Sequence, residues 1–226
     1  MSTATKIIVW DWNGTLLDDT DACVAAINQY LAIAAKPKID SDKFRTCFDI
    51  PITRLYENLG FTEIEIQESM ARWQEIFHEN YEMMARICQL REGARSILRS
   101  TELVNINNFI LSNHIAHSIT SHLSRHEAEH QIHMVMAYES RATQFREPKG
   151  QRFATHMREQ GLIPANGIII GDTPEEVQIG RELGLTTIAI TGGYASESRL
   201  QAAKPDYLIH ALPEMLPILR QKGFVP

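Results

Sequence analysis

Residues 6–18 have the sequence KIIVWDWNGTLLD, in which a short apolar run leads directly into a polar turn. The run from Ile7 to Trp10 contains no polar residue, which is typical of a strand that is buried on both faces of a sheet. Asp11 follows this run at once. Ligands of open α/β sheets bind outside the carboxyl ends of the strands, so Asp11 is a candidate functional residue.

Later segments repeat the pattern of this first run. They are Asn108–Leu111 before Ser112, Ile132–Ala137, Gly167–Ile170 before Gly171 and Asp172, and Thr186–Ile190. Helix-length amphipathic segments accompany them, at Gly93–Ser100, His114–His126, Lys149–Gln160 and Pro174–Leu183. Strands that alternate with helices predict a parallel sheet of βαβ units, that is, an α/β protein with a Rossmann-like core. Asp11, Ser112 and Asp172 should then lie at the carboxyl edge of this sheet.

Residues 19–88 interrupt the alternation, because they show only helical periodicity. Thr20 is a candidate cap for a helix to about Ala35, and Asp40–Phe48 gives a second helix. Pro51 at a first helical position and Gly60 just past the end frame a third, and Thr62 opens a long fourth. The expected apolar stripe of the fourth helix is Ile64, Met70, Trp73, Ile76, Phe77, Tyr81 and Met84. We therefore expect an all-helical cap domain, residues 18–89, inserted into an α/β core of residues 1–17 and 90–226.

The composition excludes several classes of protein. With 44% hydrophobic residues and a net charge of −6, the chain is not expected to be disordered or to bind nucleic acid. No stretch approaches the roughly 18 consecutive apolar residues of a membrane helix, and the first apolar run is too short for a signal peptide. Cys23, Cys47 and Cys88 form no C-x-x-C pair, which indicates reduced thiols. We expect a cytoplasmic protein, of an oligomeric state that the sequence does not determine.

Four short motifs occur in order along this framework. Asp11-x-Asn13-Gly14-Thr15 follows the first strand, Ser112-Asn113 ends the second, Lys149 opens a helix, and Gly171-Asp172 precedes Thr173-Pro174-Glu175-Glu176. Together they resemble the haloacid dehalogenase superfamily of phosphohydrolases, in the branch with a helical cap inserted after the first motif. The resemblance covers the core at both ends of the chain. Within the cap, only its position and its helical character match.

The resemblance implies a role for each of these residues. Asp11 would be the nucleophile that forms an aspartyl-phosphate, while Ser112 and Lys149 would hold the phosphate oxygens. The Asp11 carboxylate, the Asn13 backbone carbonyl and Asp172 would bind Mg²⁺, which prefers oxygen ligands. Further substrate contacts are expected from Trp12, Gly14, Thr15, Asn113 and His114. Glu175 and Glu176 would support the metal or start the helix, with Thr173 as its N-cap and Pro174 at its first position.

Asn13 departs from the family pattern. Phosphatases of this superfamily carry a second aspartate two residues after the nucleophile, which protonates the leaving group and then activates water. An amide does not exchange a proton at neutral pH, so this contribution, typically about 10²–10⁴ in rate, should be missing here. Asn13→Asp is expected to restore it. His114, two residues after Ser112, is a candidate substitute acid.

Two other branches of the superfamily also lack this second aspartate. The dehalogenases need no metal, an interpretation that the acidic set Asp172, Glu175 and Glu176 argues against. The phosphonatases use a cap lysine as a Schiff-base amine, for which Lys36, Lys38 and Lys43 are candidates, although solvated surface lysines are the simpler interpretation.

The function expected from the resemblance is that of a Mg²⁺-dependent phosphohydrolase. Its substrate would be a small phosphorylated metabolite such as phosphoglycolate or a sugar phosphate, with the cap segment Phe44–Pro51 facing it. The alternatives are a catalytically impaired phosphate-binding protein and a phosphotransferase, and Asn13 is the main support for both.

Six histidines lie within one short segment: His114, His117, His122, His126, His130 and His133. His122, His126 and His130 share the four-residue spacing of one helix face, so a transition-metal site is an alternative. The simpler expectation is a polar, exposed helix face, because no carboxylate or cysteine joins the histidines in a ligand motif.

Overall fold

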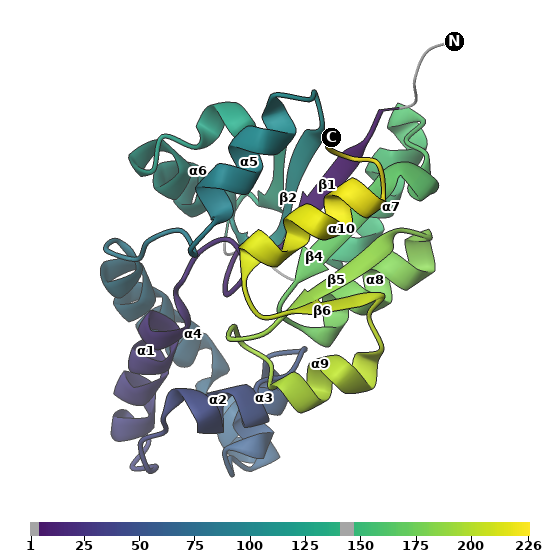
Figure 1. The fold of residues 1–226 in the computed structure, drawn as a ribbon. Helices are drawn as coiled ribbons and strands as arrows, with labels where there is room; N and C mark the ends of the chain where they lie inside the picture. Colours follow the sequence, from purple (N-terminus) through teal and green to yellow (C-terminus); the bar gives the residue numbers. More distant parts are fainter. Residues whose placement is uncertain (1–4, 141–146) are drawn as a thin grey trace.

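The computed structural model describes residues 5–140 and 147–226, and at residues 69–71, 73 and 74 it describes the backbone alone. At its centre lies a six-stranded sheet of order β3-β2-β1-β4-β5-β6, in which neighbouring strands are parallel (Figure 1). The strands are β1 (Ile7–Trp10), β2 (Asn107–Ile115), β3 (Met134–Tyr138), β4 (Gly167–Gly171), β5 (Thr186–Ile190) and β6 (Tyr207–Ile209). The predicted α/β fold with a parallel, Rossmann-like core is confirmed.

Strand β1 lies between β2 and β4, and the register aligns the ends of these three strands. Trp10 pairs with Ile110 of β2 and with Ile170 of β4. The backbone N–H of Asp11 still donates to the carbonyl of Ile170, at 2.9 Å. Because parallel strands end at the same edge of a sheet, the residues that follow these positions come together there.

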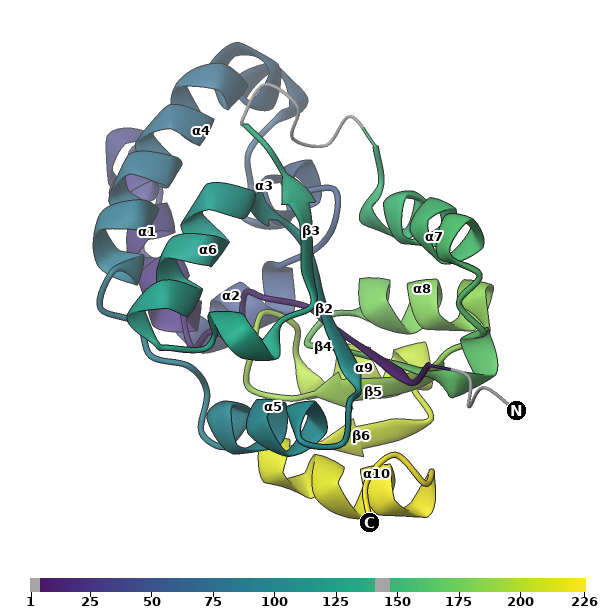
Figure 2. The same ribbon diagram turned by 90° about the horizontal axis from the view of Figure 1, so that it is seen from above.

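Helices cover both faces of the sheet (Figures 1 and 2). The first layer is made by α5 (Ala94–Glu102), α6 (Ala116–Arg125) and α10 (Met215–Gln221), the second by α7 (Lys149–Gln160) and α8 (Pro174–Leu183). Ile8 and Trp10 of β1 belong to the core of the first layer, whereas Ile7 and Val9 belong to that of the second. The unbroken apolar run of β1 follows from this arrangement, since both of its faces are buried.

The remaining short elements of the core lie around this framework. Helix α9 (Glu197–Ala203) packs through Leu200 against Val177 of α8 and Ala189 of β5. Single 3₁₀ turns occur at Glu129–Gln131, Pro164–Asn166 and Leu212–Glu214.

A separate group of helices occupies the chain between β1 and α5. They are α1 (Thr20–Ile33), α2 (Ser41–Cys47), α3 (Thr53–Asn58) and α4 (Glu63–Ala85). These helices share a hydrophobic cluster of their own, in which Ile27, Phe44, Leu55 and Tyr81 are buried. The two connections to the sheet run side by side, because the Asp18 N–H donates to the Gln89 carbonyl at 2.9 Å. The domain division into residues 1–17 with 90–226 and residues 18–89 stays a prediction.

Helix starts are predicted correctly where a capping box is present. Thr62 caps α4 together with Glu65, and Thr173 caps α8 together with Glu176. Two other predicted starts are wrong. Thr20 is the first residue of α1, because Asp19 takes the N-cap position. Pro51 is not a first helical residue, because α3 begins only at Thr53.

Three further differences concern the extent of elements. Strand β2 continues through Ser112 and His114 to Ile115, so α6 begins at Ala116 and not at His114. The sequence pattern does not predict β6, α9 or α10, which are short and only partly buried. Ile64 is 66% exposed and does not belong to the apolar stripe of α4. The side chains of Met70 and Trp73, predicted in that stripe, lie outside the described residues.

The histidine-rich segment is not the exposed face that we expected. His122, on the inner face of α6, and His126, its C-cap, are buried, whereas His117, His130 and His133 are exposed. Burial, together with the charge of Arg125, lowers the pKa of His122 to about 4. Within the described ranges, no three or more His, Cys, Asp or Glu side chains are grouped so as to hold a metal ion. The transition-metal alternative therefore gains no support.

Two further observations concern the sequence expectations. The three cysteines are free thiols. Among residues 5–140 and 147–226, no helix combines the length and the apolar character needed to cross a membrane.

Candidate active site

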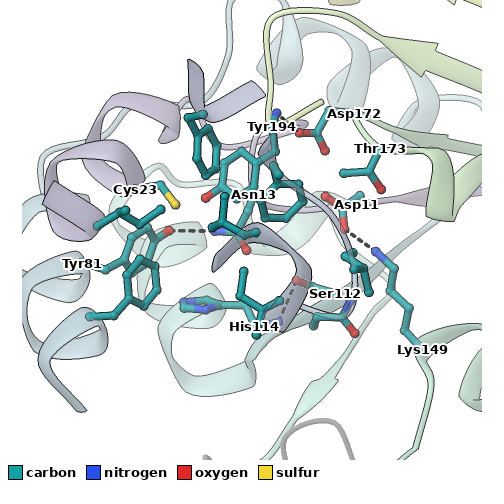
Figure 3. Close-up of a pocket in the computed structure, with 18 of the residues that line it drawn as sticks. Asp11, Asn13, Cys23, Tyr81, Ser112, His114, Lys149, Asp172, Thr173 and Tyr194 are labelled. Atoms are coloured by element: carbon teal, nitrogen blue, oxygen red, sulfur yellow. Dashed lines mark hydrogen bonds and ion pairs between the residues drawn. The ribbon is translucent and has the colours of Figure 1, made fainter. Parts of the chain in front are cut away.

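The predicted site residues converge on one cavity of about 170 Å³ (Figure 3). Asp11 follows β1, Ser112 lies in β2 and Asp172 follows β4, so three neighbouring strands each contribute one of them. Lys149, the first residue of α7, reaches the same cavity. Asn13, Asn113, His114 and Glu176 also line it. The carboxyl edge of the sheet thus gathers most of the residues singled out in the sequence.

Lys149 is a buried cation and not a solvated surface lysine. Its Nζ atom lies 2.9 Å from Asp11 Oδ1 and 3.2 Å from Glu175 Oε2, and it also contacts Glu176. Burial alone would lower the pKa of Lys149, but the charges of Asp11, Glu176 and Glu175 outweigh it and raise that pKa well above the ordinary value. Lys149 therefore stays charged, as a ligand for a phosphate oxygen must.

Asp11 and Asp172 are two buried carboxylates that share a neighbour. Thr15 Oγ1 donates to Asp172 Oδ1 at 3.0 Å and lies 3.5 Å from Asp11 Oδ2. Burial raises the pKa of Asp172, and the negative charge of Glu176 adds to this effect, so that the pKa is about 7. Burial also raises the pKa of Asp11 well above its usual value, against the opposing effect of Lys149. Charges this close and this buried repel each other, so a cation between them would stabilise both.

The backbone around these carboxylates fits a small cation with oxygen ligands. A Cβ atom on Gly14 would come within 2.2 Å of Asp172 Oδ2, and one on Gly193 would come equally close. Gly14 also has a φ of +71°, which favours glycine. Two carboxylates and the carbonyl of Asn13 are hard oxygen donors, the chemistry that Mg²⁺ requires.

Glu175 and Glu176 contact Lys149 rather than Asp172. Glu176 accepts hydrogen bonds from the Thr173 backbone N–H at 3.2 Å and from the Thr173 hydroxyl at 2.7 Å, which completes the capping box of α8. Glu175 accepts a hydrogen bond from Asn113 Nδ2 at 3.0 Å. Both glutamates therefore hold Lys149 in place, and Glu176 is a helix cap at the same time.

Ser112 and His114 lie on the same strand, but their side chains have different partners. Ser112 Oγ accepts a hydrogen bond from the His114 backbone N–H at 3.1 Å. The His114 ring packs edge-on against Tyr81 of α4, and its Nε2 atom lies 3.4 Å from Glu82 Oε1. His114 therefore connects the sheet to the helical region as well as lining the cavity.

Three predicted substrate contacts do not line the cavity. Trp12 is completely buried in the core of the first helix layer, with no exposed face for a substrate. The Gly14 N–H donates to Asp19 Oδ1 at 2.7 Å, and Thr15 holds Asp172. These residues shape the loop after β1, and their contact with a substrate stays a prediction.

Asn13 belongs to a hydrogen-bond network around Asp19, a completely buried carboxylate. Asn13 Nδ2 donates to Asp19 Oδ2 at 2.7 Å and to the Tyr81 hydroxyl oxygen at 2.7 Å. The hydroxyls of Tyr81 and Tyr194 donate to the same Asp19 oxygen, at 2.6 and 2.8 Å. Burial raises the pKa of Asp19, although these donors oppose the shift. The amide is suited to this position, because it donates where a second carboxylate would repel Asp19.

A family model described as haloacid dehalogenase-like hydrolase matches residues 8–190, most of the chain. The chain belongs to this family. Phosphoglycolate phosphatases are among its curated relatives: that of Synechococcus elongatus is 22% identical over 216 residues, 96% of this chain and 98% of the relative. That of Vibrio vulnificus is 21% identical over 222 residues, 95% of this chain and 96% of the relative. The prediction of a hydrolase of this superfamily is thereby confirmed.

The fold of this haloacid dehalogenase-like hydrolase also occurs in solved structures. A haloacid dehalogenase-like family hydrolase from Streptococcus pneumoniae superimposes with a TM-score of 0.78 at 21% identity, over 95% of this chain and 98% of that one.

Four residues of the site received no role in the sequence analysis: Asp19, Tyr81 as a hydrogen-bond donor, Glu82 and Tyr194. Asp19 directly precedes a helix, which is an ordinary place for a capping aspartate and gave no distinctive signal. Tyr194 follows β5 and its backbone N–H donates to Asp172 Oδ2 at 2.5 Å. The carboxyl-edge rule could have given Tyr194 a role, because it places residues that follow a strand near the site.

The cap lysines do not support a Schiff-base mechanism. Lys36 Nζ lies 3.2 Å from Glu65 Oε1, and Lys38 and Lys43 are exposed. None of these three lysines lines the cavity.

Proposed function

We propose that this haloacid dehalogenase-like hydrolase cleaves a phosphate monoester with Asp11 as the nucleophile. The observation that carries the proposal is the buried pair of Asp11 and Lys149, 2.9 Å apart and both facing the cavity. A carboxylate beside a fixed cation at a sheet edge can attack phosphorus while the cation binds the oxygens of the phosphoryl group.

The chemistry divides into two displacements. In the first, an oxygen of Asp11 forms a bond to phosphorus and the ester P–O bond breaks. The alcohol part leaves with the electron pair as an alkoxide, which takes its proton from water. In the second, water attacks the aspartyl-phosphate, which releases inorganic phosphate and regenerates Asp11. The Ser112 hydroxyl and the Lys149 ammonium bind phosphoryl oxygens in both steps.

A magnesium ion is part of the proposal. The carboxylates of Asp11 and Asp172 and the carbonyl of Asn13 would hold it, with Thr15 and the Tyr194 N–H orienting Asp172. When bound, it supplies positive charge that offsets the repulsion between Asp11 and a phosphate dianion. Glu175 and Glu176 support Lys149 and do not join the metal ligands.

The cap segment fits the role of covering a substrate. Phe44, Phe48 and Ile50, all within the segment Phe44–Pro51, line the same cavity as Lys149. We propose residues 18–89 as the cap and residues 1–17 and 90–226 as the core, with a small phosphorylated compound as the substrate. The phosphoglycolate phosphatases among the relatives support a small substrate of this kind.

A second candidate function is phosphate binding without efficient turnover. Asn13 favours it, because its amide is engaged by Asp19 and Tyr81 and does not exchange protons. A phosphotransferase that keeps its aspartyl-phosphate is the third possibility, because the water of the second step lacks a general base.

A panel of phosphate monoesters assayed with Mg²⁺ tests the proposal. Release of inorganic phosphate by the unmodified protein, lost in Asp11→Asn, supports the hydrolase. Thermal stabilisation by phosphate and Mg²⁺ without any release supports the binding protein instead. A stoichiometric phosphoenzyme that passes its phosphoryl group to an added alcohol supports the transferase.

A further inference from the structure

The cavity has two ends of opposite character (Figure 3). Asp11, Ser112 and Lys149 mark the polar end, at the edge of the sheet. The other end is lined by apolar side chains from the helical region: Ile27, Phe44, Phe48, Ile52, Leu55 and Phe77. These residues come from α1, α2, α3 and α4 and from the connection before α3. Cys23, Tyr56, His78 and Tyr81 complete this lining, so the group attached to the phosphate would meet a mostly apolar wall.

The apolar end is poorly suited to bind a second negatively charged group of a substrate. Among the described residues that line the cavity, Lys149 is the only lysine or arginine, and three carboxylates already surround it. His114 is close to Glu82, at 3.4 Å, and His78 packs edge-on against Phe77. A carboxylate that enters an apolar pocket without a cationic partner loses hydration that nothing replaces.

The arginines of the nearby surface are directed elsewhere. Arg45 donates to the carbonyls of Gly193 and Gly192, at 3.0 and 3.2 Å. Arg199 pairs with Asp49 at 2.8 Å, and Arg54 lies 3.5 Å from the same carboxylate. None of these arginines lines the cavity, so none is placed to bind an acidic substrate group inside it.

We propose that the physiological substrate is a phosphate monoester whose alcohol part is apolar and uncharged, of the size of a single ring or a short alkyl chain. The inference rests on the proposed phosphohydrolase function and narrows its substrate class. It separates this chain from the phosphoglycolate phosphatases among its relatives, because phosphoglycolate carries a second anionic group.

The size of the cavity agrees with this class of compound. A cavity of about 150 Å³ lined by apolar side chains stays dry and binds benzene. The cavity here measures about 170 Å³ with its polar end included, so beside a phosphoryl group it has room only for a small alcohol part. An aryl ester also suits Asn13, because a phenolate leaves with less need of a proton than an alkoxide does.

The test compares kcat/KM for phenyl phosphate, hexyl phosphate, glycerol phosphate and phosphoglycolate, all with Mg²⁺. We expect kcat/KM for phenyl and hexyl phosphate to exceed that for phosphoglycolate by at least about tenfold, the effect of burying one apolar group. Equal or higher kcat/KM for phosphoglycolate overturns the apolar class and leaves the phosphohydrolase standing.

A charge variant sharpens the comparison. Ile52→Arg adds a cation at the apolar end, where Ile52 is half-buried, and should raise the ratio of phosphoglycolate to phenyl phosphate turnover by about tenfold or more. Ile33→Arg is the matched control, because Ile33 is 57% exposed on α1 and is not among the residues that line the cavity. A ratio that shifts equally in both variants contradicts the proposed location of the alcohol group.

Binding separates this inference from the proposed function. In Asp11→Asn, calorimetry with Mg²⁺ should show phenyl phosphate binding at least about tenfold more tightly than inorganic phosphate. That result without any turnover by the unmodified protein would refute the hydrolase and keep the apolar pocket. Equal affinities for the two probes would refute the apolar pocket.

Discussion

At the scale of single residues, Asn13 cannot be understood without Asp19. The sequence alone predicts that Asn13→Asp restores a general acid and base. In the structure, Asn13 Nδ2 lies 2.7 Å from Asp19 Oδ2. A carboxylate at position 13 would meet a second buried carboxylate, and one of the two would have to hold a proton. Asn13→Asp therefore needs a second substitution, at Asp19, before it can restore a general acid and base.

We predict that Asn13→Asp alone raises the turnover of alkyl phosphates only slightly. Asn13→Asp combined with Asp19→Asn should raise it by up to about 10²–10⁴-fold. The double variant keeps one carboxylate and one amide but exchanges their positions. Steady-state kinetics on hexyl phosphate measures the gain, which should be smaller on p-nitrophenyl phosphate. Equal gains in the single and double variants would mean that Asp19 does not oppose a charge at position 13.

One control is essential in that experiment. Asn13 precedes Gly14, an arrangement prone to deamidation, so aged samples can acquire an aspartate at position 13. Peptide mass spectrometry of each preparation gives the deamidated fraction. Activity of the unmodified protein that scales with this fraction would belong to the converted chains.

Asp11→Asn should abolish phosphoryl transfer without lowering stability. The side chain is nearly isosteric, and burial raises the pKa of Asp11, so its charge opposes folding when no cation is bound. Lys149 keeps Glu175 and Glu176 as partners in the variant. Phosphate release and the midpoint of thermal unfolding check the two halves of the prediction. Activity that survives, after contaminating phosphatases are excluded, would remove Asp11 from the role of nucleophile.

Asp172 and Glu175 should differ in their effect on metal binding. Asp172→Ala removes a carboxylate that Thr15 and Tyr194 orient at the end of β4, and should weaken Mg²⁺ binding by about tenfold or more. Glu175→Ala should leave Mg²⁺ binding nearly intact and raise KM, because Glu175 contacts Lys149 and Asn113. Titration calorimetry with Mg²⁺ compares them, and equal losses would place the metal elsewhere.

At the scale of elements, α2 is fastened to the loop after β5. Arg45 donates to the carbonyls of Gly192 and Gly193, and the Ser196 N–H donates back to the Arg45 carbonyl at 3.1 Å. On the other side of the cavity, Ser118 of α6 donates to Glu82 of α4 at 2.8 Å. These contacts join the helical region to the sheet on both sides of the cavity that they enclose.

We predict that Arg45→Gln raises KM by about tenfold and changes kcat less. Two hydrogen bonds from a cation to carbonyls contribute on the order of 1–3 kcal/mol to the closed arrangement. Lys43→Gln, an exposed change on the same helix, is the matched control. Initial-rate kinetics over a range of substrate concentrations separates the two constants, and an unchanged KM in Arg45→Gln would show that this contact does not influence substrate binding.

The sequence predicted the elements whose burial leaves a simple pattern. Ile7 to Trp10 are apolar without interruption because both faces of β1 are covered, and Thr173 with Glu176 marks the start of α8 by its capping box. β6 could not be found in this way, since it has three residues, two of them half-buried. The network around Asp19 was equally hidden, because Tyr81 and Tyr194 reach it from distant parts of the chain.

At the scale of the whole molecule, the sheet edge concentrates charge that folding must bury. Asp11, Lys149, Asp172 and Glu176 are all at most 7% exposed. Lys149 compensates for part of this negative charge, but within the described part of the chain Asp172 is hydrogen-bonded to Thr15 and to the Tyr194 backbone, neither of which is a cation. An ionised Asp172 without a bound metal therefore lowers the free energy of unfolding.

Because the pKa of Asp172 is higher in the folded than in the unfolded state, the free energy of unfolding depends on pH. Burial raises the pKa of Asp172 from 3.8 to about 7, so between these values the folded state holds a proton that the unfolded state has released. Stability should therefore fall as pH rises from about 4 to about 7, by up to about 1.4 kcal/mol per pH unit, and level off above that range.

Mg²⁺ should remove this pH dependence, because a bound cation favours the ionised carboxylate and reverses the shift. We predict that urea unfolding at a series of pH values shows the decline in chelator and a flat or rising profile with Mg²⁺. Asp172→Asn should remove the share of the decline that Asp172 contributes and most of the response to Mg²⁺, since the neutral amide neither titrates nor binds the ion well. Asp11 and Asp19, whose pKa values burial also raises, keep the rest of the decline. Asp42→Asn is the matched control, because the Asp42 side chain is 94% exposed, and it should keep the full decline. The same profile with and without Mg²⁺ in the unmodified protein would mean that the buried carboxylates at the sheet edge do not bind the metal.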